Sequence, residues 1–171
     1  MNQCRSSALG IVFRRKNPNN LLIWTSLKVT MHEVKIHKVL SANDLNAVFA
    51  IRQTVFVEEQ AVDPELEYDE FEDTSTHFIA LVNGIATGTA RWRKTPNGIK
   101  LERFAVLAEY RSNGIGDALI KTLLNDLPST DKVYLHAQLR ACSLYRRNGF
   151  KEEGDQFEEA NIQHYKMVYH R

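Results

Sequence analysis

The stretch LERFAVLAEYRSNGIGDALIKTLLNDL, residues 101–127, decides the fold of this chain. It begins with a mostly apolar run, and a polar turn follows. Gly114 and Gly116 then precede an apolar pattern with helical spacing, which ends before Pro128. The stretch therefore predicts a strand, a glycine turn and a helix.

The chemistry of such a turn is anion binding, because a helix N-terminus presents unpaired N–H groups and the positive end of the helix dipole. Gly114 and Gly116 lack the Cβ atoms that would hold a phosphate away, and Arg111 adds a charged fork. A Walker loop does not fit, because Asp117 follows the second glycine, and a dinucleotide fingerprint does not fit, because position 119 is Leu. The alternative is an ordinary strand-to-helix turn, in which the glycines only allow the chain to turn tightly and bind no ligand.

The spacing Arg111-x-x-Gly114-x-Gly116 resembles the acetyl-CoA pyrophosphate loop of the GNAT superfamily of N-acetyltransferases. Residues 101–106 are similar to the strand that precedes this loop in the family. A second block, residues 135–150, resembles the family's next strand, the helix with an alanine and a tyrosine, and the Gly-Phe pair that ends it. Two blocks in this order, roughly 20 residues apart, are more specific than either block alone.

The resemblance covers about residues 32–171, and residues 52–60 resemble the ElaA-like branch. It implies an α+β fold: a mixed, mostly antiparallel sheet, with a central parallel strand pair that splays at the cofactor site and helices on both faces. It also implies an enzyme that uses acetyl-CoA as co-substrate and acetylates a small-molecule or peptide amine directly, in a ternary complex. We expect this enzyme in the cytoplasm, because the cysteine content favours a reducing compartment. Homodimers are common in the family.

The resemblance implies that the pantetheine arm fills the gap between the splayed strands and pairs with the backbone of Phe104, Ala105 and Val106. One backbone N–H would polarise the thioester carbonyl as charge builds on its oxygen. The residues expected to contact the cofactor are Phe104, Ala105, Val106, Arg111, Ser112, Asn113, Gly114, Ile115, Gly116 and Gln138.

Tyr145 matches the family's general acid, and a phenol with a pKa near ~10 can protonate a thiolate of pKa ~8.5. The alternative is that its ring only packs against the cofactor. Cys142 lies one helical turn earlier, and we interpret this cysteine as a buried residue rather than a nucleophile.

The general base is harder to assign. Glu102 lies on the cofactor strand, where relatives carry such a carboxylate, and it is our catalytic prediction beside Tyr145. The other candidates are a water chain, Glu58, Asp73, His77 and His164. Because the base is not located, a non-catalytic acyl-CoA-binding module on the same fold is the alternative function.

The composition excludes several classes of protein. With 171 residues and 43% hydrophobic residues, the chain suits one domain with a packed core. No apolar run approaches the ~20 residues that cross a bilayer. Cys4 and Cys142 make no disulfide framework, which favours a reducing compartment. No histidine pair has metal-ligand spacing, so we expect no metal.

Charge is distributed unevenly along the chain. Residues 1–32 contain five basic residues and no acidic residue, so the rest has 17 basic and 21 acidic residues, a balance of −4. That balance argues against nucleic-acid binding. We expect residues 1–30 to lie outside the fold, either because translation starts at Met31 or as a disordered tail, with a functional leader as the third interpretation.

An acidic segment occupies residues 58–73. It is either a solvated loop or an electronegative wall that attracts a cationic amine. The remaining patterns predict strands at 34–39, 77–82, 85–93, 99–106, 132–137 and 165–169, and helices at 45–55, 118–127 and 139–147.

Overall fold

The computed structural model describes residues 33–128 and 132–170, so our prediction for residues 1–30 lies outside the described part. Its strands are β1 (Val34–Lys38), β2 (Thr76–Val82), β3 (Ile85–Thr95), β4 (Gly98–Val106), β5 (Val133–Gln138), β6 (Phe150–Glu152), β7 (Phe157–Glu159) and β8 (Ile162–Tyr169). Its α-helices are α1 (Ala42–Arg52), α2 (Pro64–Glu67), α3 (Ile115–Asp126) and α4 (Cys142–Arg147). Shorter helical turns are η1 (Gln53–Glu58, π-helical) and the 3₁₀ turns η2 (Ala108–Tyr110) and η3 (Leu139–Ala141).

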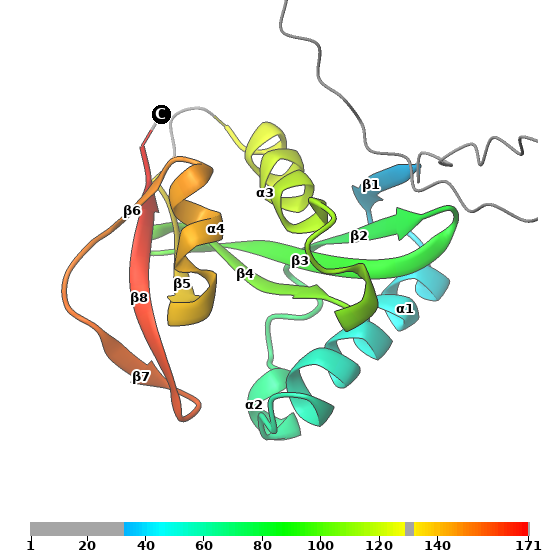
Figure 1. The fold of residues 1–171 in the computed structure, drawn as a ribbon, viewed down its shortest axis with the longest axis horizontal. Helices are drawn as coiled ribbons and strands as arrows, with labels where there is room; N and C mark the ends of the chain where they lie inside the picture. The colour runs from blue at the N-terminus through cyan, green and yellow to red at the C-terminus, as the bar shows by residue number, and fades with distance from the viewer. Residues whose placement is uncertain (1–32, 129–131, 171) are drawn as a thin grey trace, which may run out of the picture. The chain divides into compact units, whose positions relative to one another are not determined.

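The strands form one mixed sheet in the order β1-β2-β3-β4-β5-β8-β6, and β7 pairs with β8 (Figure 1). Every described pair is antiparallel except β4 and β5, which are parallel and are joined through α3. A parallel pair needs such a crossover because its strands run in the same direction. The predicted α+β sheet with one central parallel pair is confirmed.

The parallel pair separates soon after it begins. Its register runs from Ile99–Val133 to Leu101–Leu135 and stops there. β4 nevertheless continues to Val106, so the edge of β4 that faces β5 has no strand partner over its last residues. This separation of β4 from β5 beyond Leu101 and Leu135 is called the split below.

The two faces of the sheet are covered by different helices, and Figure 1 shows α1 and α3 on opposite sides of β2 and β3. The main core lies on the α3 face, where Leu119 and Phe78 belong to one buried cluster. On the other face, Ile51 and Val55 form a smaller cluster with Ala105. Burial of such side chains contributes about 1.5–3 kcal/mol each and holds β4 between the two layers.

Local sequence explains the ends of the helices. The Ser41 hydroxyl accepts a hydrogen bond from the Asp44 N–H at 3.1 Å, so this residue is the N-cap of α1. The helix predicted over 139–147 is instead the 3₁₀ turn η3 followed by α4, which begins without a side-chain cap. Asn148 and Gly149 end it, and the glycine has a left-handed φ of 90°.

Candidate active site

A cavity of about 860 Å³ follows the split. Its walls come from the last half of β4, the turn before α3, β5, α4, the segment around α2, and the β7–β8 hairpin. Nine of the ten residues predicted to contact a cofactor line this cavity, and so do both predicted catalytic residues. The nine are Phe104, Ala105, Val106, Arg111, Ser112, Gly114, Ile115, Gly116 and Gln138.

The tenth residue, Asn113, stabilises the turn by hydrogen bonds to its backbone. Its side-chain amide donates to the backbone carbonyls of Tyr110 and Arg111 at 3.2 and 3.1 Å. Gly114 caps α3 with a left-handed φ of 78°, and Ala118 N–H makes the first helical bond to it at 3.0 Å. The N–H groups of residues 115–117 therefore have no acceptor within the helix, which is the arrangement that binds anions.

Gly116 also has a packing role, in addition to its predicted contact with the cofactor, which stays a prediction. A Cβ atom at this position would lie 3.1 Å from Leu144 Cδ2, which is tighter than ordinary packing. The missing side chain therefore lets α3 approach α4. The same helix pair is joined by Asp117, which accepts two hydrogen bonds from Arg147 and one from Asn148, each at 2.7 Å. The Arg147 hydrogen bonds, helped by Asn148, lower the pKa of Asp117 to about 2.

The Arg111 guanidinium has two partners within the chain. Its Nε donates to the Val106 carbonyl at 2.8 Å, and its Nη2 lies 2.5 Å from Glu59 Oε2. The neighbouring Gln60 accepts a hydrogen bond from Gln138 Nε2 at 2.9 Å. Residues 59–60, which follow η1, therefore contact both sides of the split.

Tyr145 lies on α4 and is 6% exposed. Its ring meets the Phe104 ring edge-to-face at 5.7 Å, so it borders the open part of β4. Burial raises the pKa of the Tyr145 hydroxyl above its ordinary value. The phenol therefore remains protonated and able to donate, but it is a weaker acid than the sequence argument assumed.

Cys142 is 2% exposed, and its Sγ lies 3.6 Å from the Gln138 carbonyl oxygen. Burial raises the pKa of this thiol. A thiol kept protonated in the core is a poor nucleophile, which agrees with our interpretation of Cys142 as a buried residue.

Glu102 is surrounded by cations. Its Oε1 lies 2.7 Å from Arg93 Nε and 2.9 Å from Arg91 Nη2, and its Oε2 lies 3.2 Å from Lys100 Nζ. Burial acts to raise the pKa of Glu102, but the charges of Arg91, Lys100 and Arg93 outweigh it and lower the pKa. A carboxylate held in this way is a weak proton acceptor, so these contacts argue against the predicted base, which stays a prediction.

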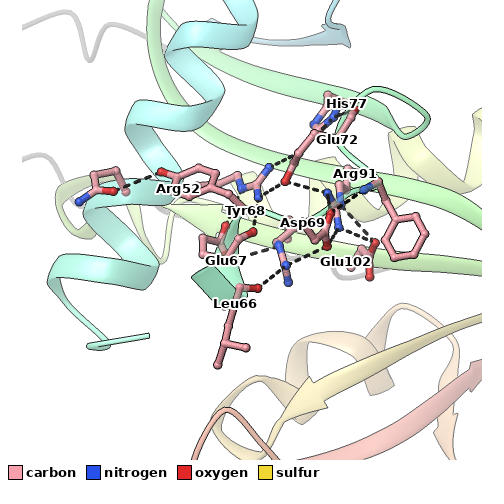
Figure 2. A network of polar contacts seen from close by, with 12 residues as sticks. Arg52, Leu66, Glu67, Tyr68, Asp69, Glu72, His77, Arg91 and Glu102 are labelled. Carbon is pink, nitrogen blue, oxygen red and sulfur yellow. Dashed lines mark hydrogen bonds and ion pairs between the residues drawn. The ribbon is translucent and has the colours of Figure 1, made fainter. Parts of the chain in front are cut away.

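Three carboxylates of the acidic segment, those of Glu67, Asp69 and Glu72, are paired with buried arginines (Figure 2). Arg52 and Arg91 are both 0% exposed. Arg52 binds Glu67 at 2.5 Å and Glu72 at 2.6 Å, and Arg91 binds Asp69 at 2.5 Å and Glu72 at 3.0 Å. We call these five residues the arginine–carboxylate network. Because its carboxylates already have cations, they do not form an electronegative wall for an amine.

Arg103 extends this network to the cavity. It lies in a β-bulge of β4 with a left-handed φ of 57°, which costs a non-glycine residue about 1–2 kcal/mol. Its Nη2 donates to the Leu66 carbonyl at 3.0 Å and to Asp69 Oδ2 at 3.1 Å. The bulge therefore turns this arginine toward α2, at the mouth of the split.

The remaining candidates for the base are scattered. Glu58 and Asp73 do not line the cavity along the split. His77 is 6% exposed and its Nε2 lies 2.9 Å from the Glu72 carbonyl oxygen, on the α1 side. His164 does line the cavity, and its Nδ1 lies 2.7 Å from the Ile162 carbonyl oxygen.

Two residues that our sequence analysis did not single out also lie in the cavity wall. His136 on β5 and Glu159 at the end of β7 are joined by a contact of 2.9 Å between Nδ1 and Oε2. The only sign of His136 in the sequence was its position after the apolar Leu135, within the strand predicted at 132–137. Its pairing with a residue 23 positions away depends on the β7–β8 hairpin, which the sequence pattern did not define.

Within residues 33–128 and 132–170, no group of three or more His, Cys, Asp or Glu side chains could hold a metal ion. In the same part of the chain, no helix is long and apolar enough to cross a membrane.

Comparison with known proteins gives consistent matches. Residues 36–171 match the family model described as an acetyltransferase (GNAT) domain. An uncharacterized N-acetyltransferase of Bacillus subtilis, YjcF, is 33% identical over 135 residues, which cover 76% of this chain and 96% of YjcF. Escherichia coli ElaA is 25% identical with a TM-score of 0.71, over 82% of this chain and 100% of ElaA. The PaiA N-acetyltransferase of Thermoplasma acidophilum, solved with coenzyme A, is 17% identical with a TM-score of 0.61, over 80% and 98%.

Proposed function

The chain belongs to the GNAT acetyltransferase family and is an N-acetyltransferase, and on this premise we propose that it transfers acetyl from acetyl-CoA directly to a primary amine. The predicted resemblance to this family, and to ElaA, is confirmed. Solved relatives with the same fold bind coenzyme A, which supports acetyl-CoA as the donor here.

The observation that carries this proposal is the unpaired edge of β4 next to an anion-binding helix start. Beyond Leu101 the backbone groups of β4 that face β5 have no strand partner, and the turn before α3 lies at the end of this edge. A ligand with amides along one arm and a diphosphate at its end complements both features. In the proposal, residues 104–106 bind the pantetheine arm, and residues 111–116 hold the diphosphate.

In the proposal, the acceptor binds in the same cavity beside the cofactor, so that transfer takes place in a ternary complex. The amine attacks the thioester carbonyl, and a backbone N–H of β4 stabilises the oxygen on which charge builds. Tyr145 donates a hydrogen bond to the departing sulfur. Its raised pKa favours stabilisation of the thiolate over early and complete proton transfer.

The acceptor in this proposal is a small-molecule or peptide amine. The carboxylates of the arginine–carboxylate network are already paired with arginines, which weakens the reason to favour a polycation. We also propose that the enzyme acts in the cytoplasm, on the basis of its cysteine content. The family resemblance is the basis for proposing a homodimer.

The second candidate function is an acyl-CoA-binding module without catalysis. The observation that favours it is that the Glu102 carboxylate is already paired with three cations. Both functions require the same anion-binding turn. They differ in whether an amine in the cavity can lose its proton.

The test combines calorimetric binding of acetyl-CoA with thiol release over an acceptor panel: a polyamine, an aminoglycoside, a lysine-containing peptide and a free amino acid. We expect binding, thiol release with at least one amine, and the acetylated product by mass spectrometry. Binding without thiol release across the panel would favour the binding module. Absence of acetyl-CoA binding would overturn both functions.

A further inference from the structure

His136 is the first β5 residue in the split, directly after the last residue that pairs with β4. The last paired residues, Leu101 and Leu135, point into the core cluster on the α3 face. Because side chains alternate along a strand, His136 points to the opposite face, together with Tyr134 and its register partner Lys100. In the proposed function, the thioester lies between β4 and β5. His136 therefore lines the cavity on the strand that borders the reacting atoms.

The contact between His136 and Glu159 fixes the protonation of the imidazole ring. The hydrogen bond from His136 lowers the pKa of Glu159 to about 2, against burial, and Lys100 adds to the lowering. Glu159 is therefore ionised at neutral pH and can only accept, so Nδ1 of His136 must carry a proton. In the neutral ring the lone pair is then on Nε2, which has no hydrogen-bond partner among the described residues.

The ring is also held in place by packing. Phe157 meets it edge-to-face at a centroid distance of 4.8 Å, and the Tyr134 ring lies 6.1 Å away. The side chain is 27% exposed, so it is partly buried and still accessible from the cavity. The charged and titratable groups that surround it are Lys100 and Glu102 on β4, Tyr134 on β5, Glu159 on β7, and His164 and Lys166 on β8.

The other base candidates are less suitable for physical reasons. Glu102 is already paired with three cations. His164 lines the same cavity, but it lies on β8, one strand further from β4, and pairs with Gln138. Its Nδ1 faces the neutral carbonyl of Ile162, and Glu159 makes its hydrogen bond to His136 rather than to His164. His136 alone among the cavity-lining residues of the described chain combines a position at the split with a carboxylate behind its ring.

We propose that His136 is the general base of the acetyl transfer and that Glu159 positions its ring; this inference rests on the proposed function. The acceptor ammonium gives one proton to Nε2, and Glu159 stabilises the imidazolium that forms. The amine nitrogen then attacks the thioester carbonyl carbon, and the C–S bond breaks. The nitrogen loses a second proton, the thiolate is protonated to the thiol, and His136 returns its proton to water. The sum is amide, thiol and one released proton.

The test is the pH dependence of kcat/KM for the amine, between pH 6 and 10, using the panel amine that the wild-type enzyme acetylates fastest. H136N keeps a donor near the position of Nδ1 and removes Nε2. We expect about a 100-fold loss at pH 7, with acetyl-CoA affinity unchanged. The loss should shrink as the pH approaches ~10, where the amine loses its proton without help.

E159Q keeps an acceptor for Nδ1 and removes the charge. We expect kcat/KM at pH 7 to fall in this variant, but less than in H136N, because the ring is still held while the imidazolium that forms in the reaction has no counter-ion. A residue that only supports the fold would lower the rate equally at every pH. H37N, on β1 and away from the cavity, is the matched control and should behave like the wild type.

Three outcomes overturn the inference while leaving the proposed function intact: wild-type activity of H136N at pH 7, a loss in H136N that is constant from pH 6 to 10, or removal of the rising limb by H164N. If the wild-type enzyme binds acetyl-CoA but acetylates no amine in the panel, the proposed function fails, and this inference with it.

Discussion

The cofactor side and the acceptor side of the cavity are built in different ways. In the proposed function, the groups that meet the ligand on the cofactor side are backbone N–H and C=O groups of residues 104–106 and of the turn before α3. On the acceptor side, they are side chains from β4, β5 and the β7–β8 hairpin, and most of them are paired with one another. A backbone site is specified by local sequence, whereas a side-chain site depends on which distant residues the fold brings together.

The largest effect should come from the arginine–carboxylate network, which supports the acceptor side. In R91M, three carboxylates lose a buried cation, and the free energy of unfolding should fall by about 3–5 kcal/mol. Urea denaturation measures this fall. The matched control is K35M, which removes an exposed ion pair and should cost less than about 1 kcal/mol. Equal effects in the two variants would mean that this network is no more important than a surface pair.

Tyr145→Phe tests the meeting point of the two sides. We expect kcat to fall about 100-fold, because the leaving sulfur loses its hydrogen bond, while the affinity for acetyl-CoA stays the same. The Phe104 contact is kept in this variant because the ring remains. Parallel losses of kcat and cofactor affinity would instead indicate that Tyr145 only packs against the cofactor.

Arg111→Ala tests the cofactor side alone. Loss of a charged hydrogen-bond donor should weaken acetyl-CoA binding about tenfold, and added salt should reduce the difference from the wild type. Calorimetric titration measures both effects. K151A, on β6 and outside the cavity, should bind like the wild type. Unchanged binding by R111A would remove this arginine from the site.

Asp117→Asn should have the smallest effect. Asp117 has a pKa of about 2 in the fold, below its ordinary value of 3.8, so its contribution to stability is complete above about pH 4 and is lost as the pH falls toward 2. We expect D117N to be about 1 kcal/mol less stable at pH 7 and to lose less stability on acidification, by thermal unfolding. D155N, at an exposed site, is the control. A steeper acid loss in D117N would contradict the assignment.

The difference between the two sides also explains what the sequence could predict. The order of strands, the parallel pair and the glycine turn follow from patterns within about 30 residues, as residues 101–127 illustrate. The partners of Glu102 and His136 could not be derived in this way. Arg91 reaches Glu102 because β3 and β4 are in register, and Glu159 reaches His136 through the β7–β8 hairpin. Similarly, a sequence cannot distinguish an acidic loop from one whose carboxylates pair with buried arginines.

The Glu59–Arg111 contact has a consequence for how tightly the enzyme holds coenzyme A. Before any ligand arrives, this guanidinium already has an anionic neighbour within the chain. In the proposed function, Arg111 binds the diphosphate, so an incoming diphosphate replaces Glu59 as the negative partner and gains less than it would from an unpaired arginine. The carboxylate competes with the product as well, so the same contact should hasten the departure of spent coenzyme A after each turnover.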